Sequence, residues 1–177
     1  KVDTRDLDDL VELHRIMSIQ REQPVINRAP ETTRQWFSGY VGSQDPVRFI
    51  VVVRDTSGES THLPIAGYIT IDRTQDNSVV ELGQIFVHPE WRGRGIGKRL
   101  VQTALRKLQQ IALSTIDRVH VQDASPERDV GPVTQRAAVE LGFRVQADGD
   151  HYWITIPRTG LEEDAAEIDK YRNFLWQ

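Results

Sequence analysis

The stretch Glu81–Leu108, ELGQIFVHPEWRGRGIGKRLVQTALRKL, contains the pattern that decides the fold of this chain. Its first part completes an apolar, β-branched run over Val79–Val87, which predicts a buried strand interrupted at Gly83. Its last part has apolar residues three and four positions apart, which predicts an amphipathic helix over Gly95–Ala112. Between them lies a loop rich in glycine and basic residues. Because the N–H groups at a helix N-terminus lack intrahelical partners, this loop predicts an anion-binding site.

Three kinds of phosphate-binding loop can be compared with this one. The P-loop of nucleotide hydrolases requires Ser or Thr after its lysine, and here Arg99 follows Lys98, which removes the hydroxyl that binds Mg²⁺. The dinucleotide-binding pattern G-x-G-x-x-G requires a different spacing of glycines. The remaining pattern is [QR]-x-x-G-x-[GA], which Arg92, Gly95 and Gly97 satisfy.

Composition narrows the class of protein. The chain has 177 residues, of which 38% are hydrophobic and 27% charged, as expected for a soluble globular domain. Its net charge of −4 argues against a nucleic-acid partner, and no apolar run reaches the ~18 residues of a membrane span. The sequence contains no cysteine, which excludes disulfides and thiol nucleophiles and suits a cytoplasmic location. Its five histidines lack the close spacing of metal ligands, so we expect no metal.

Helical and strand patterns alternate along the rest of the chain. The expected helices are one that opens at Asp6–Leu10, one over Glu31–Tyr40, one over Gly95–Ala112, and one that starts at Pro132 and ends at Gly142. The expected strands are Val47–Arg54, Ile65–Ile71, Val79–Val87, Asp117–Gln122, Phe143–Ala147 and His151–Ile156. This order predicts the α/β class, with one mixed sheet in a single domain over residues 1–157. Residues 158–177 form a tail that we expect to be helical.

The stretches Val79–Leu105 and Ala137–Phe143 resemble the GNAT superfamily of acyl-CoA-dependent N-acyltransferases. The order of elements from Val2 to Ile156 is similar as well. The resemblance implies the GNAT fold, in which a largely antiparallel sheet flanked by helices splays between its fourth and fifth strands. In this sequence those strands are Val79–Val87 and Asp117–Gln122. Gly83 suits the splay because glycine is typical of a β-bulge.

The resemblance also implies a cosubstrate, acetyl-CoA. The glycine loop would hold the pyrophosphate of coenzyme A, and the pantetheine arm would lie in the splay. Main-chain N–H groups around Phe86 and Val87 would then bind the thioester carbonyl. The residues expected to bind the cofactor are Ile85, Phe86, Val87, Arg92, Gly93, Arg94, Gly95, Ile96, Gly97 and Lys98.

Acyl transfer to an amine requires a proton acceptor, because an amine with a pKa near ~10 is mostly protonated at neutral pH. Glu81 lies six residues before Val87, where GNAT enzymes often carry a general-base glutamate. Its place in an apolar strand is expected to raise its pKa. The alternatives are a glutamate on a solvated sheet face, or His120 on the neighbouring strand as the base.

One position departs from the family pattern. Many members place a tyrosine, which protonates the leaving thiolate, four residues before the glycine of L-G-F, and here that position is Ala138. Gly131 stands where an asparagine often begins the helix. Ser125 and Tyr152 are the candidates to supply the proton instead. Because a thiol with a pKa of ~8.5 already leaves readily, we expect a slower or differently assisted enzyme rather than an inactive one.

Three functions are compatible with this pattern. The first is N-acetyl transfer to a primary amine by direct attack, with a small-molecule acceptor favoured over a protein N-terminus or lysine. The second is a non-catalytic acyl-CoA sensor, and the third is an interaction domain of a larger protein. The tail could pack on its own domain or pair with a second subunit in a homodimer.

Two further groups of residues lie near the expected acceptor region. The aromatic residues Trp36, Phe37 and Tyr40 are spaced for core packing along a helix. The arginines Arg21, Arg28 and Arg34 are expected to be solvated, with binding of a substrate carboxylate or phosphate as the alternative.

Overall fold

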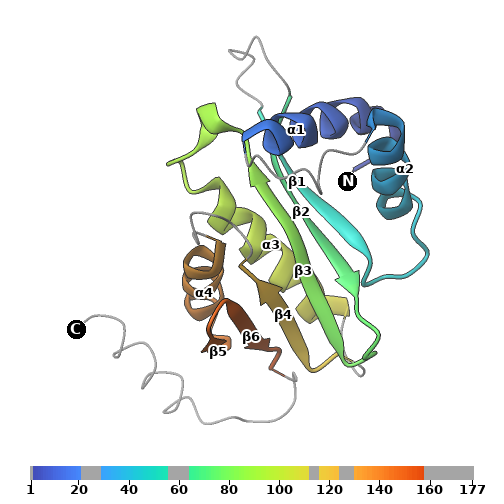
Figure 1. The fold of residues 1–177 in the computed structure, drawn as a ribbon. Coiled ribbons are helices and arrows are strands. Elements are labelled where there is room, and N and C mark those ends of the chain that lie inside the picture. The colour runs from blue at the N-terminus through green and yellow to red at the C-terminus, as the bar shows by residue number, and fades with distance from the viewer. Residues whose placement is uncertain (1, 21–28, 56–63, 112–115, 124–129, 158–177) are drawn as a thin grey trace.

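The computed structural model describes residues 2–20, 29–55, 64–111, 116–123 and 130–157. These ranges contain one sheet of six strands in the order β1-β2-β3-β4-β6-β5 (Figure 1). The strands are β1 (Phe49–Arg54), β2 (Ile65–Arg73), β3 (Val79–Val87), β4 (Arg118–Gln122), β5 (Arg144–Asp148) and β6 (His151–Thr155). Neighbouring strands are antiparallel except β3 and β4, which are parallel. The predicted mixed, largely antiparallel α/β sheet is confirmed.

Helices cover both faces of the sheet. They are η1 (Thr4–Asp6), α1 (Leu7–Gln20), α2 (Pro30–Val41), η2 (Pro89–Trp91), α3 (Ile96–Ile111) and α4 (Val130–Glu140). The expected tail helix over 158–177 lies outside the described residues. None of the described helices combines the length and apolar character that a membrane span requires.

The start of α4 corrects a prediction. Pro132 was expected at the first helical position, but the described part of the helix already includes Val130. The N–H of Gly131 donates to a carboxylate oxygen of Asp123 at 2.7 Å, and the Asp123 side chain is buried. This acidic partner satisfies a first-turn donor upstream of the proline. The end of the helix was predicted correctly, because Gly142 has a φ of +82°, as a glycine after a helix C-terminus often has.

The core consists of two apolar clusters, one on each face of the sheet. The cluster under α3 and α4 includes Leu100, Leu105 and Ala138. The cluster under α1 and α2 includes Leu10, Met17 and Phe37. Spacings of three and four residues place these side chains on one face of each helix.

The predicted packing of the α2 aromatic residues is confirmed. Phe37 and Tyr40 are buried, and Trp36 packs against the same cluster. Arg34 is bound by Asp8 of α1 and is therefore a link between two helices. Arg21 and Arg28 lie outside the described residues.

The two central strands separate after a short parallel pairing. β3 pairs with β4 only from Val79 to Leu82 and then continues beyond it (Figure 1). At this point Gly83 and Gln84 together oppose Thr70 of β2, which is a β-bulge. A Cβ on Gly83 would lie 2.7 Å from the Thr70 hydroxyl oxygen, so the bulge requires glycine. The bulge lies at Gly83, where the sequence predicted it. The splay lies between the predicted strands, which are β3 and β4, the third and fourth along the described residues.

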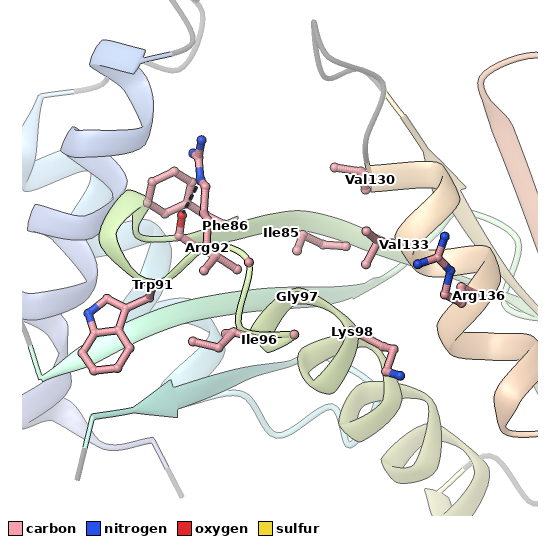
Figure 2. Close-up of a pocket in the computed structure, with 13 residues that line it drawn as sticks. Ile85, Phe86, Trp91, Arg92, Ile96, Gly97, Lys98, Val130, Val133 and Arg136 are labelled. Atoms are coloured by element: carbon pink, nitrogen blue, oxygen red, sulfur yellow. Dashed lines mark hydrogen bonds between the residues drawn. The ribbon is translucent and has the colours of Figure 1, made fainter. Parts of the chain in front are cut away.

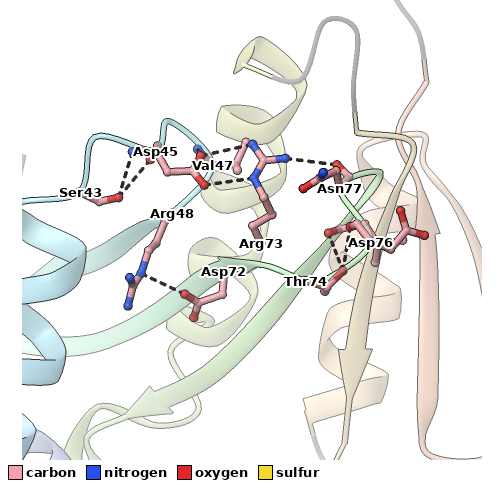
Figure 3. A network of polar contacts seen from close by, with 10 residues as sticks. Ser43, Asp45, Val47, Arg48, Asp72, Arg73, Thr74, Asp76 and Asn77 are labelled. Carbon is pink, nitrogen blue, oxygen red and sulfur yellow. Dashed lines mark hydrogen bonds and ion pairs between the residues drawn. The ribbon is translucent and has the colours of Figure 1, made fainter.

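A polar network braces the end of the sheet where β2 turns into β3 (Figure 3). The Arg73 guanidinium donates to the Asp45 carboxylate at 3.1 Å and to the carbonyl of Asn77 at 3.2 Å. On the neighbouring position of β2, Asp72 forms an ion pair with Arg48 at 3.3 Å. The Arg73–Asn77 contact holds the turn that precedes β3, the strand that carries Glu81, and the other two join β2 to the segment before β1.

Candidate active site

The glycine loop between β3 and α3 has the backbone geometry of an anion site. Gly93 and Gly95 have φ values of +75° and +74°, a region that other residues rarely adopt. The first helical hydrogen bond runs from Arg99 N to Gly95 O at 3.1 Å. The N–H groups of Ile96, Gly97 and Lys98 precede that bond, so they and the helix dipole favour an anion at this end of α3.

A cleft of about 440 Å³ lies beside the loop, where β3 has lost its β4 partner (Figure 2). Nine of the ten residues predicted to bind the cofactor line it, whereas Arg94 stacks over the Trp91 ring at 4.6 Å and is not among the lining residues. The remaining wall comes from Trp91, Val130, Val133 and Arg136. The cleft thus joins an anion-binding end to apolar walls, which fits a cofactor with phosphates and a long uncharged arm.

The charged side chains that line the cleft are all basic, namely Arg92, Lys98 and Arg136. Lys98 also binds the Glu140 carboxylate at 2.9 Å, which links α3 to α4 at the surface. The sequence analysis missed Arg136, although its spacing of three from Val133 places both on one side of α4. The basic residues of the cleft therefore come from the loop and the start of α3 and also from α4.

The main chain of β3 presents hydrogen-bonding groups to the cleft in alternation. His88 donates its N–H to Ala66 of β2 at 2.9 Å, so Phe86, two residues earlier, also faces β2. The N–H groups of Ile85 and Val87 then point to the side that β4 has left. The sequence analysis expected the N–H groups around Phe86 and Val87 to bind a thioester carbonyl. In this register the Val87 N–H points toward the cleft, whereas the Phe86 N–H points toward β2, and the Ile85 N–H takes its place.

Glu81 lies on the sheet face opposite to the cleft lining of α3 and α4. Its neighbours Val80 and Leu82 belong to the cluster under α3, and alternate residues of a strand face opposite sides. Glu81 is half-buried and precedes by one residue the last position paired with β4. It therefore sits at the edge of the splay.

Two carboxylates are adjacent on this face, but only one is bound by other side chains. Asp72 is the strand partner of Glu81; it accepts a hydrogen bond from the Tyr40 hydroxyl and pairs with Arg48. Burial raises the pKa of Tyr40, and the Asp72 carboxylate adds to this effect, so the phenol remains a donor. The Glu81 carboxylate forms no hydrogen bond or ion pair with any other residue that the structure describes. Of these two carboxylates, Glu81 is thus the one that no other described side chain binds.

His120 is the β4 partner of Glu81 and is connected to a second histidine. Its Nε2 lies 2.9 Å from Nδ1 of His151 on β6, and the two ring planes are inclined by only 19°, with their centroids 5.2 Å apart. Burial lowers the pKa of His120 below its usual value; the Glu81 charge opposes this shift and His151 adds to it. Within the described ranges, no three His, Asp or Glu side chains gather as a metal-binding group.

The position of the missing family tyrosine is closed by packing. Ala138 is fully buried in the cluster under α3 and α4. Tyr152 of β6 packs against that cluster, and a Cβ on Gly131 would lie 2.5 Å from its hydroxyl oxygen. The phenol therefore occupies the space left by the glycine, beside the cleft residue Val130. Ser125 lies outside the described residues.

Comparisons with known proteins agree with this geometry. A GNAT family acetyltransferase from Streptococcus pneumoniae superposes with a TM-score of 0.61 at 13% identity, over 88% of this chain and 94% of that one. A proposed acetyltransferase from Salmonella typhimurium, solved with its cofactor acetyl-CoA, gives 0.60 at 14% identity, over 93% and 95% of the chains. Spermidine N-acetyltransferase from Vibrio cholerae, in complex with CoA and spermine, gives 0.58 at 17% identity, over 88% and 92%.

These structural likenesses show a shared fold, and the chain matches no curated protein sequence. A sequence profile provides the family. The profile of the acetyltransferase (GNAT) family matches residues 12–128 of the 177, a range that includes the glycine loop, the splayed strands and Glu81. The chain belongs to the GNAT family of acetyltransferases.

Proposed function

We propose that this protein is an acetyl-CoA-dependent N-acetyltransferase whose acceptor is a primary amine of a small molecule. One observation carries the proposal: a basic cleft and an unengaged carboxylate lie on opposite faces of the sheet at the same splay. The Vibrio cholerae neighbour bound to CoA and spermine supports an amine acceptor. Acetyl-CoA would supply an electrophilic carbonyl carbon and a thiolate leaving group.

Each part of the site has a defined task in this reaction. The Gly95–Lys98 turn and Arg136 would hold the diphosphate, and the N–H groups of Ile85 and Val87 would bind the thioester oxygen. Glu81 would take the proton of the attacking amine. Tyr152 would donate a proton to the departing sulfur in place of the tyrosine absent at position 138.

The first experiment measures thiol release from acetyl-CoA with a panel of amino acids, polyamines, aminoglycosides and short peptides. An amine that is turned over provides the substrate for testing Glu81→Gln. We expect this variant to lower turnover about 10²- to 10⁴-fold, the usual contribution of general-base catalysis. Acetyl-CoA affinity measured by calorimetry should stay within about twofold of the wild type, because Glu81 is not in the cleft.

Asp72→Asn is the matched control, since it removes the same charge from the neighbouring strand. We expect this variant to lose stability but to retain turnover when folded, because Asp72 contacts Tyr40 and Arg48 rather than the splay. Full activity in Glu81→Gln would refute the base assignment. An equal loss in both variants would show that net charge, not proton transfer, is responsible.

The burial of Ala138 favours a second candidate, a non-catalytic acyl-CoA sensor, because it leaves α4 without an acid at that position. A sensor would bind acetyl-CoA tightly and release no thiol with any amine of the panel. Absence of both binding and turnover would contradict both functions.

A further inference from the structure

We propose that His120 and His151 form a proton relay that carries the substrate proton from Glu81 to solvent. The inference rests on the proposed function, and it assigns to these histidines a role in that reaction. It starts from three strands: β3 carries Glu81, β4 carries His120, and β6 carries His151.

The geometry of the two rings supports a directed transfer. Glu81 and His120 are strand partners, so their side chains are neighbours on one face at the spacing of adjacent strands. Nε2 of His120 lies 2.9 Å from Nδ1 of His151. Nε2 of His151 lies 3.5 Å from the Asp150 carboxylate. The side chains of His151 and Asp150 are 42% and 40% exposed. The line of groups thus leads from a half-buried carboxylate to the surface.

The proton balance needs no reactant other than water. The amine nitrogen forms a bond to the carbonyl carbon, and Glu81 takes the proton from nitrogen. The electron pair of the breaking carbon–sulfur bond stays on sulfur, which takes a proton from Tyr152. Because no hydrogen bond or ion pair joins Glu81 to His120 among the described residues, Glu81 passes that proton to a water molecule between them. The water passes a proton to His120, while Nε2 of His120 releases its own proton to Nδ1 of His151. Nε2 of His151 then releases a proton to water or to Asp150. The carboxylate is restored for the next amine, Tyr152 regains a proton from water, and the two imidazoles return to their starting tautomers by exchanging protons with water.

The surroundings of His120 keep it able to accept a proton. The Trp153 ring centroid lies 4.5 Å from that of His120, and the Arg118 guanidinium lies over the same Trp153 ring at 5.0 Å. The charged groups around the pair are Glu81, Arg118 and Asp150, together with Asp148, the β5 partner of His151. Burial favours neutral His120, the form that a relay requires.

The test uses the full chain and an amine that it acetylates. We expect His151→Gln to lower kcat about tenfold, less than removal of a direct base, and to move the acidic limb of the pH profile upward. The shift follows because removing His151 removes an influence that lowers the His120 pKa. Imidazole should restore part of the activity of His151→Ala, since the site is half-exposed. Asp148→Asn, which changes a charge beside His151 but leaves both rings in place, should keep the wild-type profile.

A second measurement does not depend on turnover. Titration of the ring nitrogens by ¹⁵N NMR should show that the His120 pKa rises in His151→Gln and falls in Glu81→Gln. Independent titrations, or an unshifted profile with normal turnover in His151→Gln, would overturn the relay alone. Absence of turnover with every amine would overturn the proposed function as well.

Discussion

Gly95 shows how much a single residue determines at the anion site. Its φ of +74° is strained for other residues, yet a Cβ there would meet nothing within 4 Å. We expect Gly95→Asp to abolish acetyl-CoA binding, because the carboxylate would place negative charge where the diphosphate is expected. Isothermal titration calorimetry on the folded variant measures this directly.

Gly149 provides a control for backbone strain. It has a φ of +61°, also with open space around a Cβ, and it lies in the β5–β6 turn rather than the loop. Gly149→Asp should carry a similar strain of about 1 kcal/mol and bind acetyl-CoA normally. Equal affinity in the two variants would mean that the loop does not hold the diphosphate.

For single residues, the sequence predicts which positions belong to the site better than it predicts which side chains reach the cleft. Arg92, Gly95 and Gly97 are recognisable from their spacing because the loop needs those residue types in that order. Arg136 was not found, since it reaches the cleft only through the packing of α4 beside the loop. That Asp72 is paired and Glu81 is not, among the described residues, could likewise not be predicted, because Asp72 is bound by Tyr40 of α2 and by Arg48.

The first turn of α4 depends on the strand that lies against it. A Cβ on Gly131 would lie 2.2 Å from Cε2 of Tyr152. Alanine normally stabilises a helix relative to glycine, but here we expect Gly131→Ala to destabilise the protein by about 1–3 kcal/mol through overpacking. Urea unfolding of the variant measures the change.

Gly97→Ala is the matched control in a neighbouring helix. Its Cβ would lie 3.7 Å from the nearest atom, a methyl carbon of Val133, so alanine should be neutral or stabilise by up to about 1 kcal/mol. In a Tyr152→Ala background, Gly131→Ala should no longer destabilise. A cost that persists without the ring would show that the close contact with Tyr152 is not its cause.

Elements were predicted best where local signals agree. β3 and α3 match their expected ranges closely because β-branched content, helical spacing and the glycine loop mark the same boundaries. The start of α4 was predicted at Pro132 because proline is common at the first position of a helix. The helix includes Val130 and Gly131 because the Asp123 carboxylate, just after β4, accepts the Gly131 N–H. The bulge could be predicted at Gly83, but its cause, the Thr70 hydroxyl, lies on another strand.

The N-terminal helix η1 is attached to the sheet by an ion pair between the buried Asp6 and the exposed Arg54, 48 residues apart in the sequence. Arg54 at the end of β1 donates to both carboxylate oxygens of Asp6 at 2.6 and 2.7 Å. These hydrogen bonds, aided by the Asp3 N–H, lower the pKa of Asp6 below 3.8. The resulting stabilisation is present above the unfolded pKa and is lost as pH falls through the lower, folded value.

We therefore expect Asp6→Asn to cost about 1.5–3 kcal/mol at neutral pH, the range for hydrogen bonds to charged groups. The difference from the wild type should shrink as pH falls below 3.8, in urea unfolding repeated across pH. Glu12→Gln removes the carboxylate of an exposed pair with Arg15 and should cost no more than about 0.5 kcal/mol. A pH-independent cost in Asp6→Asn would contradict the ion-pair explanation.

The arrangement of the whole sheet was predictable only through the family resemblance. Periodicity indicates strands, but it does not specify that β4 pairs in parallel with β3 or that β6 lies between β4 and β5. Those pairings join residues that are distant in sequence, and local propensity carries no information about them. The resemblance implied the same order of elements and the splay between the two central strands.

The separation of β3 from β4 has a consequence for the order of events in the proposed reaction. A donor that enters from the α3 and α4 side and an amine that approaches the Glu81 face would use different entrances. Neither molecule would have to depart before the other arrives, and no side chain would have to carry the acetyl group in the interval. A sequence without a single cysteine, and hence without a thiol to serve as such a carrier, is consistent with transfer in one encounter.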